Sequence, residues 1–403
     1  MKLQVFYQNQ KIGDLAEDRR GRIFFEYNSS FLSSGINLSP LTLPLKEGAQ
    51  HFDRSDFKGL FGLFYDSLPD QWGMGLLEEK LRRKGIQHSS PLMLLQYIGD
   101  RGIGALRYEP TQERVERYHT INLLKTNREA LKIVRGNFHQ GIDDDLLNAG
   151  SSLGGARPKI LIGINEKKGD FLIGNGAIPK GYSHWILKFQ DGDKTPNAEW
   201  EYLYHLIAKK LRLRTVSTKL YPLGSRKRAS LFAIQRFDRN GAERIHYHSL
   251  CGIAHIPFSN STDYDDFLNV TRELTHHQGE IEEVFKRAVF NLIGCVRDDH
   301  VKNHGYLFDG KQWRLSPVFD LLPSKWNGIH CLGYGGEHQN PTLRHLERLA
   351  LYHSIPKAKS KAIIQKTVQL FSRIGKIASS SGISSDSIDE LQERLKTHLT
   401  RIQ

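Results

Sequence analysis

Residues 296–303 read Val-Arg-Asp-Asp-His-Val-Lys-Asn, and residues 318–320 read Val-Phe-Asp. In these two segments Asn303 follows Asp298 by five positions, and Asp320 follows Asn303 by 17. Carboxylate and amide oxygens accept hydrogen bonds from hydroxyl groups and are good ligands for Mg²⁺. The spacing therefore indicates a site that orients a hydroxyl group and binds a metal. A polar loop that caps a helix is the alternative interpretation.

Protein kinases place their polar residues in a similar order. One Asp lies near the substrate hydroxyl, and an Asn five residues later and a further Asp hold Mg²⁺. On this interpretation Asp298 is the candidate catalytic residue, and Asn303 and Asp320 are the candidate metal ligands. A hairpin-like segment, Gly305–Trp313, lies between the last two and makes the pattern more specific than an isolated Asp and Asn.

The composition is typical of a globular protein that folds in water. The chain has 403 residues, of which 39% are hydrophobic and 25% charged, enough for two or three domains with real cores. No run of about 18 apolar residues occurs, so no membrane span is expected. The three cysteines, Cys251, Cys295 and Cys331, have neither metal-ligand nor CxxC spacing. A reducing cytoplasm is the simplest interpretation.

The chain is basic, with 57 Lys and Arg against 44 Asp and Glu, which gives a net charge of +13. Such a surface attracts nucleic acids, nucleotides and acidic partners. Simple solubility would explain the charge equally well. The basic residues are scattered, and no helix-turn-helix or zinc-finger spacing accompanies them, so direct reading of a DNA sequence is not expected.

Residues 1–110 are predicted to form a small mixed domain. Alternating apolar residues predict strands at Leu3–Tyr7 and Ile23–Tyr27. A helix is expected at Gln71–Lys84, with Asp70 as its N-terminal cap. A second, shorter helix at Leu92–Ile98 precedes a closing strand at 105–108.

A stretch of small residues begins at Gly150 and runs into an apolar strand, Ile160–Ile164. Glycine lets backbone N–H groups approach phosphate oxygens closely, and serine hydroxyls add donors. This stretch is neither a Walker A motif nor a GxGxxG motif, and a plain flexible turn would look the same. The candidate nucleotide-binding residues here are Ser151, Ser152, Leu153, Gly154 and Gly155.

A strand at Ser183–Phe189 carries Lys188, and a helix at Asn197–Leu211 follows it. In kinases a strand lysine grips the ATP phosphates and is steadied by a helix glutamate. Glu201 or Glu199 could pair with Lys188 in this way. Acidic residues favour any helix N-terminus, but the order of loop, lysine and helix acid favours the kinase interpretation.

The next strand, Ser230–Ile234, leads into Gln235–Arg239, where a kinase would have the hinge that meets adenine. Beyond it the chain is predicted to be helical. The expected helices, after Asn122–Arg135 upstream, are Tyr264–Leu274, Gly279–Ile293, Pro341–Tyr352, Lys357–Ile374 and Ser385–Thr400. A smaller β-rich lobe followed by a larger α-rich lobe is the architecture of kinases.

The chain resembles the HipA family, the serine/threonine kinase toxins of bacterial HipBA toxin–antitoxin modules, over nearly its whole length. The motifs that carry the resemblance are residues 66–73 (DSLPDQWG), 102–106 (GIGAL), 152–159 (SLGGARPK), 236–239 (RFDR) and 298–303 (DDHVKN). The resemblance implies an α+β, HipA-like kinase fold. It would have an extra N-terminal subdomain at 1–110, a β-rich small lobe with the phosphate loop at 111–245, and an all-α large lobe at 246–403.

The resemblance also implies residue roles. Asp298 matches the catalytic Asp, Asn303 and Asp320 match the Mg²⁺ ligands, and Lys188 matches the lysine that holds the ATP phosphates. Ser152 falls where family members autophosphorylate, and the neighbouring Ser151 could serve instead. An added phosphate of about −1.5 to −2 charges would repel ATP from the loop and silence the kinase.

Three positions depart from the patterns of relatives or ordinary kinases. Gln235, which with Phe237 falls at the adenine hinge, replaces a Glu found in some members. The segment 319–321 lacks the Gly of a DFG motif. His300 stands where ordinary kinases often have Lys. Lys302 either neutralises the transferring phosphate or is a solvated loop charge, and both interpretations stay open.

The function that the resemblance implies is that of a type II toxin, acting in the bacterial cytoplasm. It would use ATP and Mg²⁺ to phosphorylate a protein target, with aminoacyl-tRNA synthetases as the family's best-known target class, and so cause growth arrest or persistence. Its partner would be a HipB-like helix-turn-helix antitoxin that carries it to operator DNA. The rival interpretations are a catalytically inactive corepressor and a kinase of small molecules.

Overall fold

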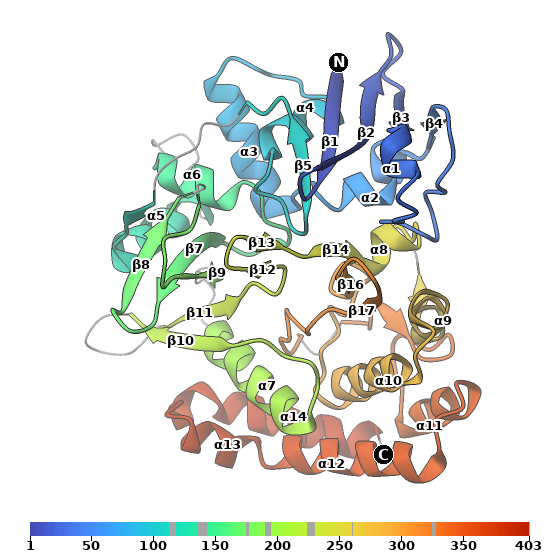
Figure 1. Cartoon of the computed structure of the whole chain (residues 1–403). Helices are drawn as coiled ribbons and strands as arrows, with labels where there is room; N and C mark the ends of the chain where they lie inside the picture. The colour runs from blue at the N-terminus through green and yellow to red at the C-terminus, as the bar shows by residue number, and fades with distance from the viewer. Residues whose placement is uncertain are drawn as a thin grey trace. The chain divides into compact units, whose positions relative to one another are not determined.

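The computed structural model describes residues 1–112, 118–134, 143–174, 177–189, 195–223, 230–259, 261–324 and 328–402. The chain divides into two compact units, and Figure 1 labels their helices and strands. Unit 1 consists of Met1–Lys194, Tyr221–His248 and Leu307–Lys311. Unit 2 consists of Thr195–Leu220, Ser249–Tyr306 and Gln312–Gln403.

Unit 1 begins with a five-stranded antiparallel sheet in the order β4-β3-β2-β1-β5. In β1 the side chains of Leu3, Val5 and Tyr7 are buried and alternate with more exposed ones, as expected for a sheet with one covered face. The predicted strands of this region are thereby confirmed. Their bounds are β1 Lys2–Tyr7, β2 Gln10–Glu17, β3 Ile23–Tyr27, β4 Gln50–His51 and β5 Leu106–Glu109.

The helices that follow in unit 1 include the predicted one at 71–84. It is α3 (Gln71–Arg83), and its buried residues include Trp72 and Leu76. Asp70 occupies the N-cap position, but its side chain makes no capping hydrogen bond, so the expected cap is wrong. The other helices here are α1 Ser29–Leu32, η1 Ser55–Phe57, α2 Gly62–Tyr65 and α4 Pro91–Ile98.

A second sheet holds six strands in the order β10-β11-β9-β7-β8-β6, of which the five from β11 to β6 lie wholly in unit 1 and the first is β10 (Thr218–Pro222). In it Lys188 on β9 lies opposite both Lys159 on β7 and Phe232 on β11. The strands are β6 His119–Thr120, β7 Lys159–Asn165, β8 Asp170–Ile173, β9 Ser183–Lys188 and β11 Ser230–Gln235. Helices α5 (Leu123–Val134) and α6 (Asp144–Gly150) precede β7 in the chain, and the short strands β12 (Arg239–Asn240) and β13 (Glu243–Arg244) pair antiparallel.

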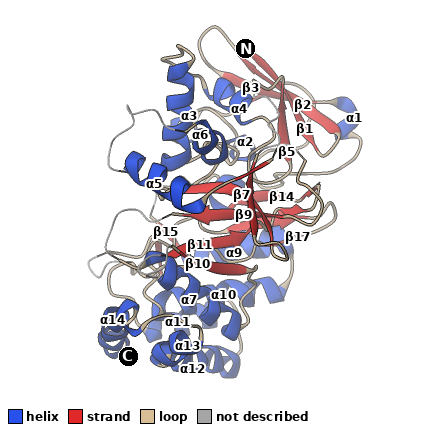
Figure 2. Cartoon of the chain, turned by 90° about the vertical axis from the view of Figure 1, so that its left-hand side faces the viewer, coloured by secondary structure: helices blue, strands red, loops and turns tan. Residues whose placement is uncertain are grey.

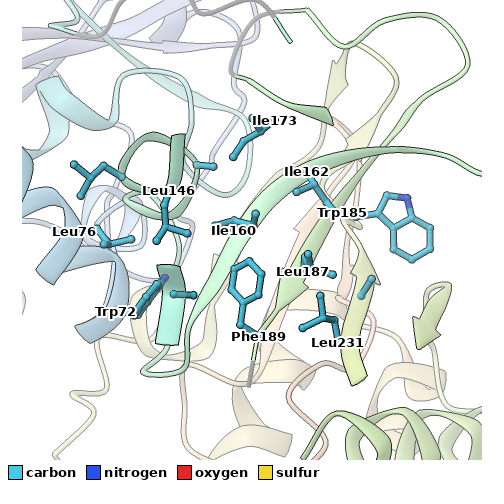
Figure 3. Packing of buried hydrophobic residues seen from close by; sticks show 14 of the residues in the cluster. Trp72, Leu76, Leu146, Ile160, Ile162, Ile173, Trp185, Leu187, Phe189 and Leu231 are labelled. Atoms are coloured by element: carbon cyan, nitrogen blue, oxygen red, sulfur yellow. The ribbon is translucent and has the colours of Figure 1, made fainter. Parts of the chain in front are cut away.

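One hydrophobic core joins this sheet to α3 and α6. Trp72 and Leu76 from α3, Leu146 from α6 and Ile160 from β7 belong to the same buried cluster, and Figure 3 shows their side chains converging. The first predicted domain therefore shares its core with the phosphate-loop region that follows it. The predicted domain boundaries after residues 110 and 245 stay predictions.

Unit 2 is rich in helices, which are blue in Figure 2. Within it α10 packs against α9, α11, α12 and α14, so the helices expected from the sequence in this region pack against one another. The helices are α7 Asn197–Leu211, α8 Leu250–Ile253, α9 Tyr264–Thr275, α10 Gln278–Ile293, α11 Leu343–Tyr352, α12 Lys357–Ser372, α13 Ile374–Ser380, η2 Ser385–Ser387 and α14 Asp389–Ile402.

The C-terminal region expected to be all-α also contains short strands. Two of them, β15 (Thr262–Asp263) and β18 (Leu332–Gly333), pair in parallel. The others are β14 His246–Ser249, β16 Gly305–Phe308 and β17 Trp313–Leu315. Strands of two to four residues are hard to foresee because so few residues cannot display an alternating pattern.

Among the described residues, no helix combines the length and the apolar character that crossing a membrane requires.

Candidate functional site

The catalytic loop, defined here as residues 296–304, is folded back on itself. Asn303 Nδ2 donates to the backbone oxygen of Asp298 at 2.7 Å, and the Asn303 N–H donates to the backbone oxygen of His300 at 2.8 Å. The side chain of Asp298 is 73% exposed. The loop therefore fixes the backbone of Asp298 while its carboxylate stays open to solvent.

The structure brings together the three acceptors that the sequence singled out. Asp298, Asn303 and Asp320 line one cavity of unit 2, together with the buried Asp299. Asp320 has a φ of 52°, the left-handed region that non-glycine residues seldom adopt. Such a conformation is retained only where the surroundings enforce it, and it is common at functional sites.

The donor set at this cavity fits Mg²⁺. Magnesium in phosphate-transfer sites is held by one or two carboxylates together with phosphate and water oxygens. Asp320 offers a carboxylate, and Asn303 offers Oδ1 because its hydrogen bond to the loop uses Nδ2. Within the described residues there is no cluster of three or more His, Cys, Asp or Glu side chains that could hold a metal ion.

Two other predicted residues of the loop lie close to Asp298. His300 Nε2 is 3.7 Å from Asp298 Oδ1, and the Lys302 N–H donates to His300 Nδ1 at 3.2 Å. The ring of Phe258, itself 58% exposed, packs edge-on against the His300 ring with centroids 4.6 Å apart. Whether His300 or Lys302 contacts a nucleotide stays a prediction.

Asp299 and Ser324 are residues that the sequence reasoning missed. Ser324 Oγ accepts hydrogen bonds from the N–H groups of Arg297 and Asp298, at 3.0 and 3.2 Å. Asp299 is buried and accepts four hydrogen bonds. A second acid directly beside the catalytic candidate was the available signal, but an acid in a loop normally faces water, so the sequence did not reveal its burial.

In unit 1 the Gly/Ser loop, defined here as residues 151–155, lies against α3. Asp70 Oδ2 accepts from the Gly155 N–H at 2.9 Å, and the Trp72 N–H donates to the Gly155 backbone oxygen at 3.1 Å. At Gly73 an added Cβ would come within 2.3 Å of the Leu153 backbone oxygen. The start of α3 and the loop are thus packed at van der Waals contact, which only a glycine permits at residue 73.

The two candidate serines of this loop are both buried. Ser151 Oγ accepts from Arg101 Nη1 at 3.1 Å. Ser152 is 6% exposed, and its Oγ has no hydrogen-bond partner within the described part of the chain. Neither hydroxyl can meet a phosphate donor in this conformation, because a buried oxygen is out of reach of a solvent-borne nucleotide.

Two buried lysines of unit 1, Lys159 on β7 and Lys188 on β9, lie opposite each other on neighbouring strands. Lys188 Nζ is 5.7 Å from the centre of the Phe232 ring. The sequence reasoning did not single out Lys159. Its Nζ lies only 2.3 Å from the position that a Cβ atom on Gly155 would occupy. Gly155 has a φ of 81°, so both its backbone and the lysine beneath it require a glycine.

The acids proposed to pair with Lys188 lie on α7. Glu199 and Glu201 are both buried residues of that helix. They belong to unit 2 and Lys188 belongs to unit 1, so this pairing stays a prediction.

The RFDR motif at 236–239 forms a buried ionic cluster. Asp238 Oδ2 accepts from Arg236 Nη2 at 2.7 Å, from Arg239 Nη1 at 2.6 Å and from the Gly104 N–H at 2.7 Å. Both arginines also donate to the backbone oxygen of Gly102. Burial raises the pKa of Asp238, but the two guanidinium groups outweigh burial and hold it well below its usual range.

This cluster explains two motifs that are far apart in the sequence, because residues 236–239 clamp the glycine turn at 102–104. The adenine hinge proposed for the same segment stays a prediction. Gln235 is the last residue of β11, and the Phe237 ring packs against the Tyr247 ring at 5.6 Å.

Family comparisons agree with these motifs. Residues 3–109 match the HipA N-terminal domain, and residues 151–374 match the HipA-like C-terminal domain. The chain belongs to the HipA family. The second match alone covers more than half of the chain, and it includes the Gly/Ser loop, Lys188 and the catalytic loop.

Individual relatives of this HipA-family chain are distant. A putative kinase, Y4mE of Sinorhizobium fredii, is 24% identical over 347 residues, which cover 79% of this chain and 76% of the relative. The structure is similar to HipA in the Shewanella oneidensis MR-1 complex of HipA, HipB and operator DNA, with a TM-score of 0.74 at 17% identity over 99% of this chain and 96% of that one. This likeness confirms the expected α+β, HipA-like fold.

A weaker likeness links the chain to the Helicobacter pylori proinflammatory kinase CtkA. The TM-score is 0.40 at 14% identity, over 55% of this chain and 85% of that one. Similarity at this level supports no conclusion about this chain.

Proposed function

We propose that this HipA-family chain is a toxin kinase that transfers the γ-phosphoryl group of ATP to a serine or threonine of a protein. The observation that carries the proposal is the cavity of unit 2 in which Asp298, Asn303 and Asp320 meet. Membership of the HipA family and the relative named as a putative kinase give it further support.

In the proposed reaction Asp298 orients the acceptor hydroxyl and takes its proton. The hydroxyl oxygen forms a bond to the γ-phosphorus, the bond between that phosphorus and the β–γ bridging oxygen breaks, and ADP leaves. An exposed carboxylate on a fixed backbone suits this role, because the substrate must reach it and its direction must not vary.

Asn303 and Asp320 would hold Mg²⁺ through their side-chain oxygens. When bound, this ion would offset the negative charge that develops on the transferred group. The ATP phosphates would also be contacted by Lys188 and by His300 or Lys302 on the catalytic loop. The proposed adenine contacts are the backbone at Gln235 and Phe237.

The Gly/Ser loop would cradle the ATP phosphates with its backbone N–H groups. Of these groups, the Gly155 N–H already donates to Asp70. Phosphate binding by this N–H, and phosphorylation of Ser152 or Ser151, both require the loop to leave α3. A phosphate on either buried serine would then prevent the loop from returning, because about −1.5 to −2 charges cannot be buried without compensation.

The proposed partner is a HipB-like antitoxin, and operator DNA would be reached mainly through it. Support comes from the fold shared with HipA in the complex of HipA, HipB and operator DNA, and from the net charge of +13. The proposed target is a protein, with aminoacyl-tRNA synthetases as the class that the family suggests. The proposed compartment is the bacterial cytoplasm.

The proposal is tested by incubating the purified chain with γ-labelled ATP and Mg²⁺, beside Asp298→Asn. The matched control is Asp386→Asn, which changes an exposed acid of η2. The native chain and the control should label themselves at Ser151 or Ser152, and Asp298→Asn should lose at least about a hundredfold in rate. Absence of label together with absence of nucleotide binding by calorimetry would reject the kinase.

Expression in a bacterial host separates the rival functions. Asp298→Asn should relieve growth arrest, whereas arrest that persists in this variant would point to a catalytically inactive corepressor. Label that appears only on a metabolite, and on no protein of the host extract, would show a kinase of small molecules instead.

A further inference from the structure

Each carboxylate oxygen of Asp299 accepts two hydrogen bonds from groups in unit 2. Its Oδ1 accepts from the N–H groups of Cys331 and Leu332, at 2.9 and 3.3 Å. Its Oδ2 accepts from the Tyr264 hydroxyl at 2.9 Å and from His330 Nδ1 at 3.0 Å. Because a carboxylate oxygen only accepts, His330 must carry its proton on Nδ1 in this arrangement.

These hydrogen bonds tie the catalytic loop to the segment that follows Asp320. Residues 330–332 lie on that segment and end in β18, which pairs with β15 just before α9. The Cys331 N–H is also shared with the backbone oxygen of Arg297, and Arg297 donates to the backbone oxygen of Gly328. Loop and segment are therefore joined at consecutive residues on both sides.

Ser324 makes a second junction between the same two segments. Ser324 lies four residues beyond Asp320, and its hydroxyl oxygen accepts a hydrogen bond from the backbone N–H of Asp298 itself. Asp298 and Asp320 thus lie on two chain segments whose separation is set by the Ser324 and Asp299 junctions. A shift of about 1 Å between reacting groups can cost a hundredfold in rate, so such junctions have leverage over catalysis.

The polar chain behind Asp299 returns to the cavity. Tyr264 receives a hydrogen bond from Asn291 Nδ2 at 2.8 Å. Asn291 is buried and lines the same cavity as Asp298, and its Oδ1 has no hydrogen-bond partner within the described residues. Hydrogen-bonded side chains that only stabilised the fold could lie anywhere in the core. The chain of Asn291, Tyr264 and Asp299 instead connects the cavity wall to the catalytic loop.

We propose that Asp299 is a positioning residue of the kinase site. Its buried carboxylate anchors the segment after Asp320 to the catalytic loop, and it thereby sets the relative positions of Asp298 and Asp320. The inference rests on the proposed function, since the reaction it serves is phosphoryl transfer to a hydroxyl.

The test compares Asp299→Asn and Tyr264→Phe with Asp265→Asn. Asparagine places an NH₂ group where Asp299 has an acceptor oxygen, so it must face one pair of the donors. Tyr264→Phe removes one of the four hydrogen bonds to Asp299, together with the bond that Tyr264 accepts from Asn291, and keeps the Asp299 carboxylate. The control, Asp265→Asn, weakens another carboxylate–histidine contact of α9, the 2.8 Å bond to His353, without touching the catalytic loop.

Autophosphorylation is measured at saturating and at limiting Mg·ATP, with melting temperature alongside. Asp299→Asn should lower kcat by about a hundredfold, as expected for misplaced reacting groups, and should leave the KM for ATP nearly unchanged. Tyr264→Phe should lower kcat less, and the control should not lower it. A loss of melting temperature in Asp299→Asn with kcat intact below that temperature would overturn the inference.

Hydrogen exchange supplies a readout that does not depend on turnover. The anchor predicts faster exchange in Asp299→Asn both at Cys331 and Leu332, whose N–H groups lose the carboxylate acceptor, and at Asp298 and Asn303 in the loop. Exchange that rises only at residues 331 and 332 would overturn the inference. If the native chain shows no kinase activity, the proposed function fails, and the exchange experiment still decides whether the anchor exists.

Discussion

Asp70 Oδ2 accepts a hydrogen bond from the Gly155 N–H at 2.9 Å, across 85 residues of sequence. Asp70 precedes α3 and would ordinarily cap it, but its side chain is directed to the Gly/Ser loop instead. Asp70 of the motif at 66–73 and Gly155 of the motif at 152–159 are therefore joined in one structural element. Under the proposed function, release of the loop for ATP binding would break this bond.

Asp70→Ala is expected to loosen the Gly/Ser loop. The variant leaves the Gly155 N–H without its charged acceptor, so the free energy of unfolding should fall by about 1–3 kcal/mol. Phosphorylation of Ser151 or Ser152 should become faster, because the buried hydroxyls are exposed more often. Urea unfolding and the rate of label incorporation measure the two effects. Asp53→Ala, at an exposed position of the same unit, should change neither.

Gly73→Ala is expected to displace the loop from α3. The new methyl group would lie 2.3 Å from the Leu153 backbone oxygen and 2.7 Å from Pro69 Cβ, and backbone cannot move aside as a flexible side chain can. Overpacking of this kind costs about 1–3 kcal/mol. Limited proteolysis should show new cleavage between residues 150 and 156. Gln71→Ala, exposed on the same helix, should show none, and a Gly73→Ala chain with native stability and no new cleavage would contradict the packing described.

Asp238→Asn is expected to be among the most damaging substitutions in unit 1. It removes the charge that faces the buried Arg236 and Arg239, and breaking a buried ion pair on one side costs about 3–5 kcal/mol. Because both arginines also hold the turn at Gly102, residues 102–104 should lose protection in hydrogen exchange. Glu243→Gln, an exposed acid on β13, serves as the control and should cost less than about 0.5 kcal/mol.

Stability should decrease as the pH is lowered below about 6.5, partly because of His246. Burial, with the nearby His248, lowers the pKa of His246 to about 3 in the folded chain. Between these pH values the unfolded chain binds a proton that the folded chain does not. The stabilising contribution is therefore complete above about pH 6.5 and falls toward pH 3, by up to about 1.4 kcal/mol per pH unit.

His246→Gln tests this dependence. Glutamine can still donate to the Leu38 backbone oxygen, as His246 Nε2 does at 3.0 Å, but it does not titrate. The unfolding free energy of the variant should depend less steeply on pH between 6.5 and 4 than that of the native chain. His88→Gln, at an exposed histidine, should keep the native slope. Equal slopes for all three proteins would show that His246 binds a proton as readily in the folded chain as in the unfolded chain, which would contradict the prediction.

Local sequence patterns were sufficient for much of the secondary structure. The alternation in residues 3–7 predicted β1, and the helices expected at 264–274 and 279–293 agree with α9 and α10 to within one residue at each end. The fold between Asp298 and Asn303 is also local, because their hydrogen bond spans only five residues. These features are predictable because they depend only on residues that are close together in the sequence.

The short strands and the partners of the buried polar groups were not predictable in this way. A pair such as β15 and β18 has two residues on each side, too few for any periodicity. Lys159 was only the last residue of the motif at 152–159, before the predicted strand Ile160–Ile164, and only packing placed its Nζ beneath Gly155. The all-α expectation for the C-terminal lobe missed the short strands for the same reason.

By itself the sequence determined the family, the order of the motifs and the residues that could do chemistry, because these depend on residue identity and spacing. Tertiary structure alone decided that Asp298, Asn303 and Asp320 line one cavity, that Asp70 binds Gly155 rather than capping α3, and that Asp299 is buried. The physical reason is that an acid's role depends on which donors surround it. Those donors come from segments tens of residues away, which only the folded chain brings within 3 Å.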